Sequence, residues 1–305
     1  MRLATILAGQ EAKAVAVAAD GRYVDIAATA AGIAGAAGDA LRSGRVQTII
    51  EAGPGALDAL AAALPSAPAS ACHDPATVTL MAPIPAPAKN VFCVGRNYAA
   101  HIAEGDRAQK QNVGVSEHPV FFTKPLTAVI GHGAEIPIFP RLSTSIDYEV
   151  ELAVVIGKSG RDIRPGDAMD HVMGVTILND VTARDIQRRH GGQYFKGKAL
   201  DGSCPIGPWI VTMDEIGDLT NLDIGCAVNG ETRQAGNTEQ LIFDIPTLIA
   251  SLSEGLTLDP GDIIATGTPS GVGYAMDPPR FLGDGDVVTC HVEKIGTLEN
   301  RCVSQ

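Results

Sequence analysis

The chain has 305 residues, of which 45% are hydrophobic and 19% charged, and its formal net charge at pH 7 is −12. This composition predicts one large or two ordinary folded domains and excludes global disorder. The acidic balance argues against nucleic acid as a partner, and it means that an anionic substrate needs local arginines and lysines.

The sequence predicts no signal peptide, no membrane span and no site built from paired cysteines. The apolar run at the N-terminus ends at Gly9, which is too short for a signal peptide, and no stretch of about 18 apolar residues predicts a membrane span. The six cysteines form no Cys-x-x-Cys pair. We therefore expect reduced thiols in a cytoplasmic protein without a membrane partner.

The first 70 residues predict a small α/β domain. Short strand-like segments, RLATIL and KAVAVAA, precede an Asp20-Gly21 hairpin turn, and two alanine-rich stretches predict helices. Six prolines fall between residues 65 and 90, so residues 71–89 are predicted to be a linker.

Residues 90–305 predict a second domain of different texture. Short strands recur between Gly, Pro and Asp turns, and helical stretches are few, at about residues 97–104, 181–190 and 244–254. The pattern predicts an α+β, β-rich fold rather than a regular βαβ series.

Two glutamates two residues apart, Glu149 and Glu151, lie in an apolar strand-like segment. Side chains at this spacing on a strand share a face, so the two carboxylates would repel unless a cation or an arginine neutralises them. A divalent-metal site is one interpretation and an exposed strand edge is the other. Asp180, at the end of the strand GVTILND, is a candidate third ligand or a helix N-cap.

A histidine and a glutamate three residues apart, His101 and Glu104, follow the strand VFCVG. On a helix they share a face, and a carboxylate that holds a histidine suits it to act as a general base. An exposed pair without a function is the alternative. Arg96 is a candidate carboxylate ligand or an ordinary surface arginine.

Two loops offer further polar groups. Lys196 and Lys198 lie among Gly, Asp and Pro, where a lysine can stabilise an oxyanion or be solvated. The segment ATGTPSGVG lacks the Gly-Lys-Ser/Thr ending of a phosphate loop, and it predicts a tight turn that is either structural or brings Thr268 to a ligand.

The order of the motifs is more specific than any one of them. The sequence between residues 85 and 303 resembles the fumarylacetoacetate hydrolase family in seven consecutive segments: FCVGRNYAAHIAE, FFTKP, DYEVELAVVIG, GVTILNDVTARDIQ, KGKALDGSCPIGPW, DIIATGTPSGVG and GDVVTCHVEKIGTLENRC. The resemblance implies a mixed β-sandwich-roll catalytic domain, a homodimer and a Mg²⁺ or Mn²⁺ site, with Ca²⁺ possible in a crystal.

The resemblance also implies roles for individual residues. The metal ligands are Glu149, Glu151 and Asp180, and the catalytic residues are His101, Glu104 and Lys198, whereas Lys196 does not match the family's lysine. The substrate-binding positions are Arg96, Tyr98, Gln187 and Thr268.

The implied function is a metal-dependent hydrolase that cleaves a C–C bond in an acylpyruvate or other 2,4-dioxo acid. In such an enzyme His101, held by Glu104, activates water, and the metal orients a 2-oxo acid. The alternatives are a lyase (a 2-oxo-3-deoxy sugar-acid dehydratase or an oxaloacetate-type decarboxylase), an isomerase, and a non-catalytic metal-binding relative. Against the last stands the intact set of His101, Glu104 and Lys198. The polar residues 105–118 predict either a lid or a solvated loop.

Overall fold

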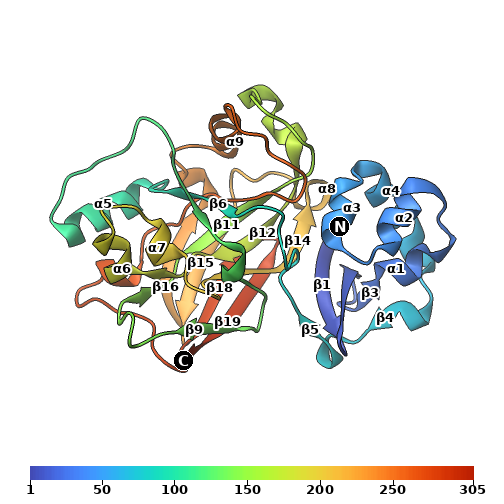
Figure 1. Ribbon diagram of the computed structural model, residues 1–305, viewed down its shortest axis with the longest axis horizontal. Helices are drawn as coiled ribbons and strands as arrows, with labels where there is room; N and C mark the ends of the chain where they lie inside the picture. The colour runs from blue at the N-terminus through green and yellow to red at the C-terminus, as the bar shows by residue number, and fades with distance from the viewer.

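The computed structural model describes residues 1–305 and has two lobes of unequal size (Figure 1). The smaller lobe, blue in Figure 1, is formed by the N-terminal residues, and the rest of the chain forms the larger, strand-rich lobe. This architecture confirms the predicted β-rich α+β class.

The N-terminal lobe places four short helices against a small set of strands. Its elements are β1 (Arg2–Ala8), β2 (Glu11–Val17), β3 (Tyr23–Asp25), α1 (Ile26–Thr29), α2 (Gly35–Arg42), α3 (Val46–Glu51), α4 (Pro54–Ala63), β4 (Cys72–His73) and β5 (Thr79–Leu80). The segment RYVDIAA, which follows the Asp20-Gly21 turn, has the pattern of a strand that runs beyond Asp25. The structure ends it there because the Asp25 carboxylate accepts a hydrogen bond from the Ala28 N–H at 3.0 Å and caps α1.

One twelve-stranded sheet passes through both lobes. Its order is β4-β3-β2-β1-β14-β12-β11-β17-β6-β7, with β5 beside β1 and β8 beside β14. The strands from the larger lobe are β6 (Val91–Gly95), β7 (Val120–Lys124), β8 (Val129–Ile130), β11 (Val150–Ile156), β12 (Val172–Asn179), β14 (Cys204–Thr212) and β17 (Ile263–Ala265). The lobes join where β1 pairs with β14, with Leu3 opposite Ile210.

The proline-rich stretch between the lobes contacts the sheet at several points. Strand β5 pairs with β1, and the Thr5 hydroxyl donates to the Pro83 carbonyl at 2.7 Å. Ala82 and Ile84 are buried. The chain therefore crosses from one lobe to the other against the sheet.

A second sheet packs on the first in the larger lobe. Its five strands, in the order β16-β15-β18-β19-β9, are β9 (Glu135–Ile138), β15 (Asp223–Val228), β16 (Glu231–Asn237), β18 (Val287–Val292) and β19 (Gly296–Ser304), and a two-stranded sheet pairs β10 (Ile146–Asp147) with β13 (Thr182–Ala183). The two large sheets share a core of 38 buried residues.

Strand β11 is buried on both faces. Val150, Leu152 and Val154 belong to the core between the sheets. Ala153 and Val155 belong to a second core that also contains residues of the N-terminal lobe. Burial on both faces explains why this strand reads as an almost continuous apolar run, and it leaves Glu151 only 1% exposed.

Five helices cover the larger lobe. They are α5 (Ala99–Gln109), α6 (Arg184–Arg189), α7 (Phe195–Lys198), α8 (Met213–Ile216) and α9 (Ile245–Ser253). Helix α5 continues five residues beyond its predicted end at residue 104, and the stretch predicted as a helix over 181–190 divides into β13 and the shorter α6. No helix is long and apolar enough to cross a bilayer.

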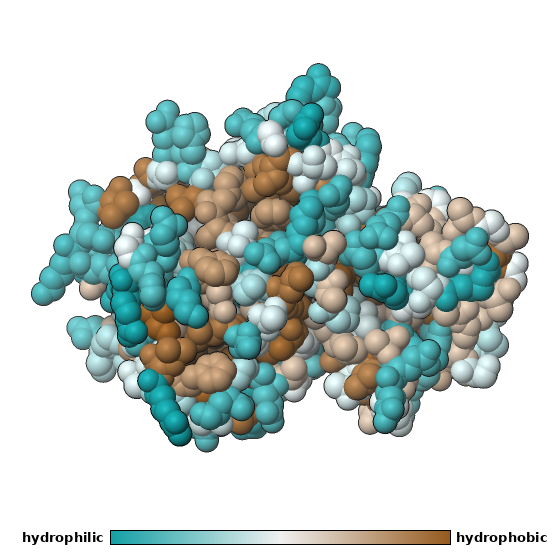
Figure 2. All heavy atoms as spheres, in the orientation of Figure 1, coloured by the Kyte–Doolittle hydropathy of each residue, from teal (hydrophilic) through white to brown (hydrophobic).

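The two lobes differ in surface character. On the face drawn in Figure 2, the most hydrophobic residues, in brown, gather over the larger lobe, whereas the smaller lobe is mostly pale or teal. The pale colour fits the alanine-rich sequence of the N-terminal helices.

We predict that the two lobes unfold together because one sheet joins them. Leu3 is fully buried beside the β1–β14 junction, so Leu3→Ala is expected to cost about 2–4 kcal/mol. Calorimetry should show one transition at a lower temperature. Leu7→Ala, on the same strand but 36% exposed, is the control and should cost less. Two separate transitions in Leu3→Ala would contradict the prediction.

Candidate active site

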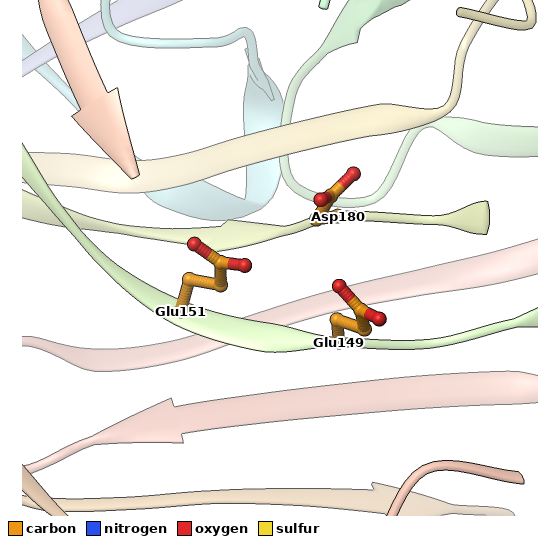
Figure 3. Close-up of side chains that lie close together, drawn as sticks. All are labelled: Glu149, Glu151 and Asp180. Atoms are coloured by element: carbon orange, nitrogen blue, oxygen red, sulfur yellow. The ribbon is translucent and has the colours of Figure 1, made fainter. Parts of the chain in front are cut away.

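Three carboxylates converge where strands β11 and β12 meet (Figure 3). Glu149 directly precedes β11, Glu151 is its second residue, and Asp180 directly follows β12. The Asp180 N–H donates to the Glu149 carbonyl at 2.8 Å, which fixes the two segments side by side. One ligand oxygen from each carboxylate lies within 4.8 Å of the others, and all three residues are buried.

Two of the three carboxylates have cationic partners. The Lys198 Nζ donates to Glu149 Oε2 at 2.7 Å and to Asp180 Oδ2 at 2.6 Å. Arg184 Nη2 donates to Glu149 Oε1 at 2.5 Å. Glu151 receives only the Gly267 N–H, at 2.7 Å from Oε2, and is 1% exposed.

The unequal pairing separates the acidities of the two glutamates. Burial, reinforced by the charges of Asp180 and Glu149, raises the pKa of Glu151 well above its usual range. Burial alone would also raise the pKa of Glu149, but Arg184 and Lys198 outweigh it and lower that pKa. Glu151 is thus a buried acid without an ion-pair partner.

These residues fit a divalent cation. All three donors are carboxylate oxygens, the ligand type that Mg²⁺ and Mn²⁺ prefer, and no histidine or cysteine belongs to the cluster. A cation among them would also compensate Glu151, the one carboxylate that the protein leaves without a positive partner.

Lys198 is a hydrogen-bond donor rather than a base. Burial would lower its pKa, but Asp180 and Glu149 outweigh that effect and raise it. An ammonium group has three N–H bonds, and Lys198 uses two of them on carboxylates, so one remains for a ligand oxygen. Lys196 is exposed on the same short helix, in accord with the choice between the two lysines that the resemblance implied.

Lys124 belongs to the site although the sequence analysis gave it no role. Its side chain is completely buried, and its Nζ donates to Asp180 Oδ1 at 2.7 Å, the Val181 carbonyl at 3.0 Å and the Lys198 carbonyl at 2.6 Å. It therefore holds one metal-ligand candidate and the backbone of Lys198 together. The signal in the sequence was a lysine at the end of the strand VFFTK.

The predicted histidine–glutamate pair lies on helix α5. His101 Nδ1 is 3.0 Å from Glu104 Oε1, and Glu104 Oε2 accepts the Gly271 N–H at 2.8 Å. We infer that Nδ1 carries the hydrogen, because Glu104 is the acceptor. The free lone pair is then on Nε2, which makes that atom the available base.

One loop connects this pair to Arg184. Along Gly271–Tyr274, the first two N–H groups donate to Glu104 and the next two to Asp147. Asp147 in turn accepts from Arg184 Nε at 2.8 Å. Gly271 has a φ of +107°, and a Cβ there would lie 2.0 Å from the Arg233 carbonyl oxygen, so only glycine permits this path.

A cavity of about 490 Å³ joins these groups. It is lined by 23 residues, which include most of the predicted site: Arg96, His101, Glu149, Glu151, Gln187, Lys198 and Thr268. Tyr98, expected to bind substrate, does not line it. Its side chain is 1% exposed, and its hydroxyl is buried without a hydrogen-bond partner.

Thr268 is oriented by a residue that the sequence analysis missed. Gln234 Oε1 accepts the Val150 N–H, so its Nε2 must be the donor to the Pro269 carbonyl and to Thr268 Oγ1, each at 2.8 Å. Because Thr268 Oγ1 already accepts this bond, its own hydrogen is free to point into the cavity. Nothing in the local sequence around Gln234 indicated this link.

One wall of the cavity is formed by part of the segment predicted as a lid or loop. Residues 105–109 continue α5, and Val113 and Gly114 line the cavity. The Asp106 carboxylate accepts the N–H groups of these two residues at 3.0 and 3.1 Å. Arg96 binds Asp106 at 3.3 Å and the Gly114 carbonyl at 2.9 Å. Whether the wall moves on binding stays a prediction.

The chain belongs to the fumarylacetoacetate hydrolase family. Residues 90–303 match the family described as "Fumarylacetoacetate (FAA) hydrolase C-terminal". This establishes the resemblance that the motif order indicated, and it defines the site as that of a family enzyme with an acidic metal-binding cluster.

Known relatives carry different activities. The chain is 50% identical over 225 residues, 73% of each protein, to oxaloacetate tautomerase YisK of Bacillus subtilis. A fumarylacetoacetate hydrolase of Exiguobacterium antarcticum is 37% identical, with a TM-score of 0.82 and full coverage of both chains. Maleylpyruvate hydrolase of Sphingobium sp. SYK-6, solved with manganese(II) and pyruvate, is 32% identical, with a TM-score of 0.78 over 100% of this chain and 99% of that one.

We predict that Glu151→Gln weakens metal binding without lowering the stability of the metal-free protein. The variant should bind Mn²⁺ about tenfold or more weakly, measured by calorimetry, because a carboxylate ligand is lost. The metal-free variant should melt no lower than the wild type, because the change removes an uncompensated buried acid. Glu135→Gln, an exposed acid on β9, is the control. Unchanged Mn²⁺ affinity in Glu151→Gln would refute the ligand assignment.

Proposed function

We propose that this chain is a divalent-metal-dependent enzyme that interconverts the keto and enol forms of oxaloacetate or a closely related 2-oxo acid. The observation that carries the proposal is the position of the His101–Glu104 pair and the three-carboxylate cluster around one cavity. The relative of Bacillus subtilis named as an oxaloacetate tautomerase, 50% identical, supports this substrate.

The cluster of Glu149, Glu151 and Asp180 would hold the metal. When bound, a divalent ion supplies Lewis acidity toward the carboxylate and oxo oxygens of a 2-oxo acid, which makes the neighbouring C–H bond more acidic. Lys198 adds its third N–H to the oxygen that gains negative charge. Thr268 adds the hydroxyl hydrogen that Gln234 leaves free.

Tautomerisation moves one proton and breaks no carbon–carbon bond. His101 Nε2 takes a proton from C3 of the substrate, and the two electrons of that C–H bond form the C2–C3 double bond. The imidazolium of His101 then gives this proton to the oxygen on C2, which yields the enol and restores the neutral base. Glu104 keeps the imidazole in the required tautomer and stabilises it while it is charged.

Hydrolysis of a C–C bond, the reaction first expected from the sequence, is the second candidate. The same His101–Glu104 pair suits the activation of water, and the structural relatives named as hydrolases support it. Their identities to this chain, 37% and 32%, are lower than the 50% of the tautomerase relative. The order of the two candidates follows from that difference. The lyase alternatives, dehydration and decarboxylation, would use the same enolate-stabilising groups.

A substrate panel separates the candidate reactions. We expect the Mg²⁺-loaded protein to speed the change in enol absorbance of oxaloacetate without releasing pyruvate or CO₂. Release of pyruvate and an acid from an acylpyruvate would support the hydrolase instead. Release of CO₂ from oxaloacetate or loss of water from a 2-oxo-3-deoxy sugar acid would identify a lyase. No turnover of any of these compounds, with metal bound, would refute all the catalytic readings.

The role of His101 has its own prediction. His101→Ala should lower kcat by roughly 10²- to 10⁴-fold, because the proton acceptor is lost. Its Mn²⁺ affinity should stay within about twofold, because His101 is not one of the three candidate ligands. His73→Ala, in the N-terminal lobe, is the control variant. Full activity in His101→Ala would exclude this residue as the base.

A further inference from the structure

The positively charged side chains around the cavity differ in whether they have an acidic partner. Of the arginines and lysines that line it, Arg96 pairs with Asp106, and Lys198 pairs with Glu149 and Asp180. Arg184 is held at 2.5 Å by Glu149 and at 2.8 Å by Asp147. Arg188 also lines the cavity, and no acidic side chain lies within ion-pair distance of it.

Helix α6 directs this free charge toward the site. Arg184 and Arg188 are four residues apart, so they share a face of α6. Both guanidinium groups lie over the ring of Tyr274, at 4.4 Å and 5.1 Å from its centre. The ring of Tyr274, which also lines the cavity, thus holds Arg188 at the cavity wall by a cation–π contact.

We propose that Arg188 binds the second carboxylate of a dicarboxylic 2-oxo acid and so selects such acids over those with a neutral tail. The inference rests on the proposed function for the 2-oxo acid end of the substrate. It adds Arg188 as the residue that binds the carboxylate at the opposite end. Oxaloacetate has this second carboxylate at C4, whereas acetylpyruvate, of the acylpyruvate class, has an uncharged acyl group there.

Arg188 is displaced along α6 from the residue that touches the carboxylate cluster. Four residues advance a helix by about 6 Å. The paired Arg184 touches the metal-ligand candidate Glu149, and the unpaired Arg188 lies one turn farther along α6. The guanidinium fork matches a carboxylate in two hydrogen bonds.

Binding of stable analogues tests the proposal apart from catalysis. Malate and 2-hydroxybutanoate share a 2-hydroxy acid head and differ by a carboxylate in place of a methyl group. We expect the Mg²⁺-loaded wild type to bind malate about tenfold more tightly in calorimetry. Arg188→Met should lose that preference and leave 2-hydroxybutanoate affinity within about twofold. Arg188→Lys should restore part of it.

Arg189→Met is the matched control. Arg189 is the next residue on α6, carries the same charge and does not line the cavity, so this variant should keep the malate preference. Raising the ionic strength should weaken malate binding more in the wild type than in Arg188→Met, because an exposed ion pair is screened. A purely structural role for Arg188 would not alter this salt dependence.

The outcomes separate this proposal from the one on which it rests. Equal binding of the two acids by the wild type, or an unchanged malate preference in Arg188→Met, overturns the assignment of Arg188. A malate preference that depends on Arg188, in a protein that does not turn over oxaloacetate, supports the assignment and refutes the tautomerase function.

Discussion

The site depends on one electrostatic constraint, which is that three carboxylates are buried together where β11 and β12 meet. Burying like charges at this separation is costly unless positive charge accompanies them. The protein supplies part of that charge through Lys124, Lys198 and Arg184. Glu151 has no ion-pair partner, and burial raises its pKa, so it is the carboxylate whose charge a bound cation would compensate.

The groups that hold these charges also arrange the proposed catalytic residues. Lys124 fixes Asp180 and the backbone of Lys198. The N–H groups of the loop Gly271–Tyr274 donate to Glu104 and to Asp147. The same loop therefore supports both the His101–Glu104 pair and Arg184. Because consecutive N–H groups of one loop bind both carboxylates, neither carboxylate has much freedom to move. The geometry of the base relative to the cluster is therefore set by backbone, not by flexible side chains.

The same arrangement explains why family membership leaves the reaction open. An acidic cluster, a lysine donor and a histidine base stabilise an enolate whether a proton, an acyl group or CO₂ leaves the carbon next to it. What distinguishes the reactions is the rest of the cavity. Arg188 lines this cavity beside Tyr274, and no acidic side chain pairs with it. It lies outside the carboxylate cluster and the His101–Glu104 pair.

Sequence by itself determined the class of fold, from the recurring short strands and few helices. It also determined the strand that follows Glu149 and contains Glu151, and the local pair His101–Glu104, because these follow from spacings of two and three residues along the chain. Asp180 was a candidate from its place at the end of a strand, and the order of motifs assigned its role and the choice of Lys198 over Lys196. Only the tertiary structure revealed Lys124 and Gln234 and the sheet shared by the two lobes. It also showed that Tyr98 does not line the cavity and that Arg188 has no acidic partner. The reason is physical: these contacts join residues from distant segments, and no local pattern records which buried charge another segment will neutralise.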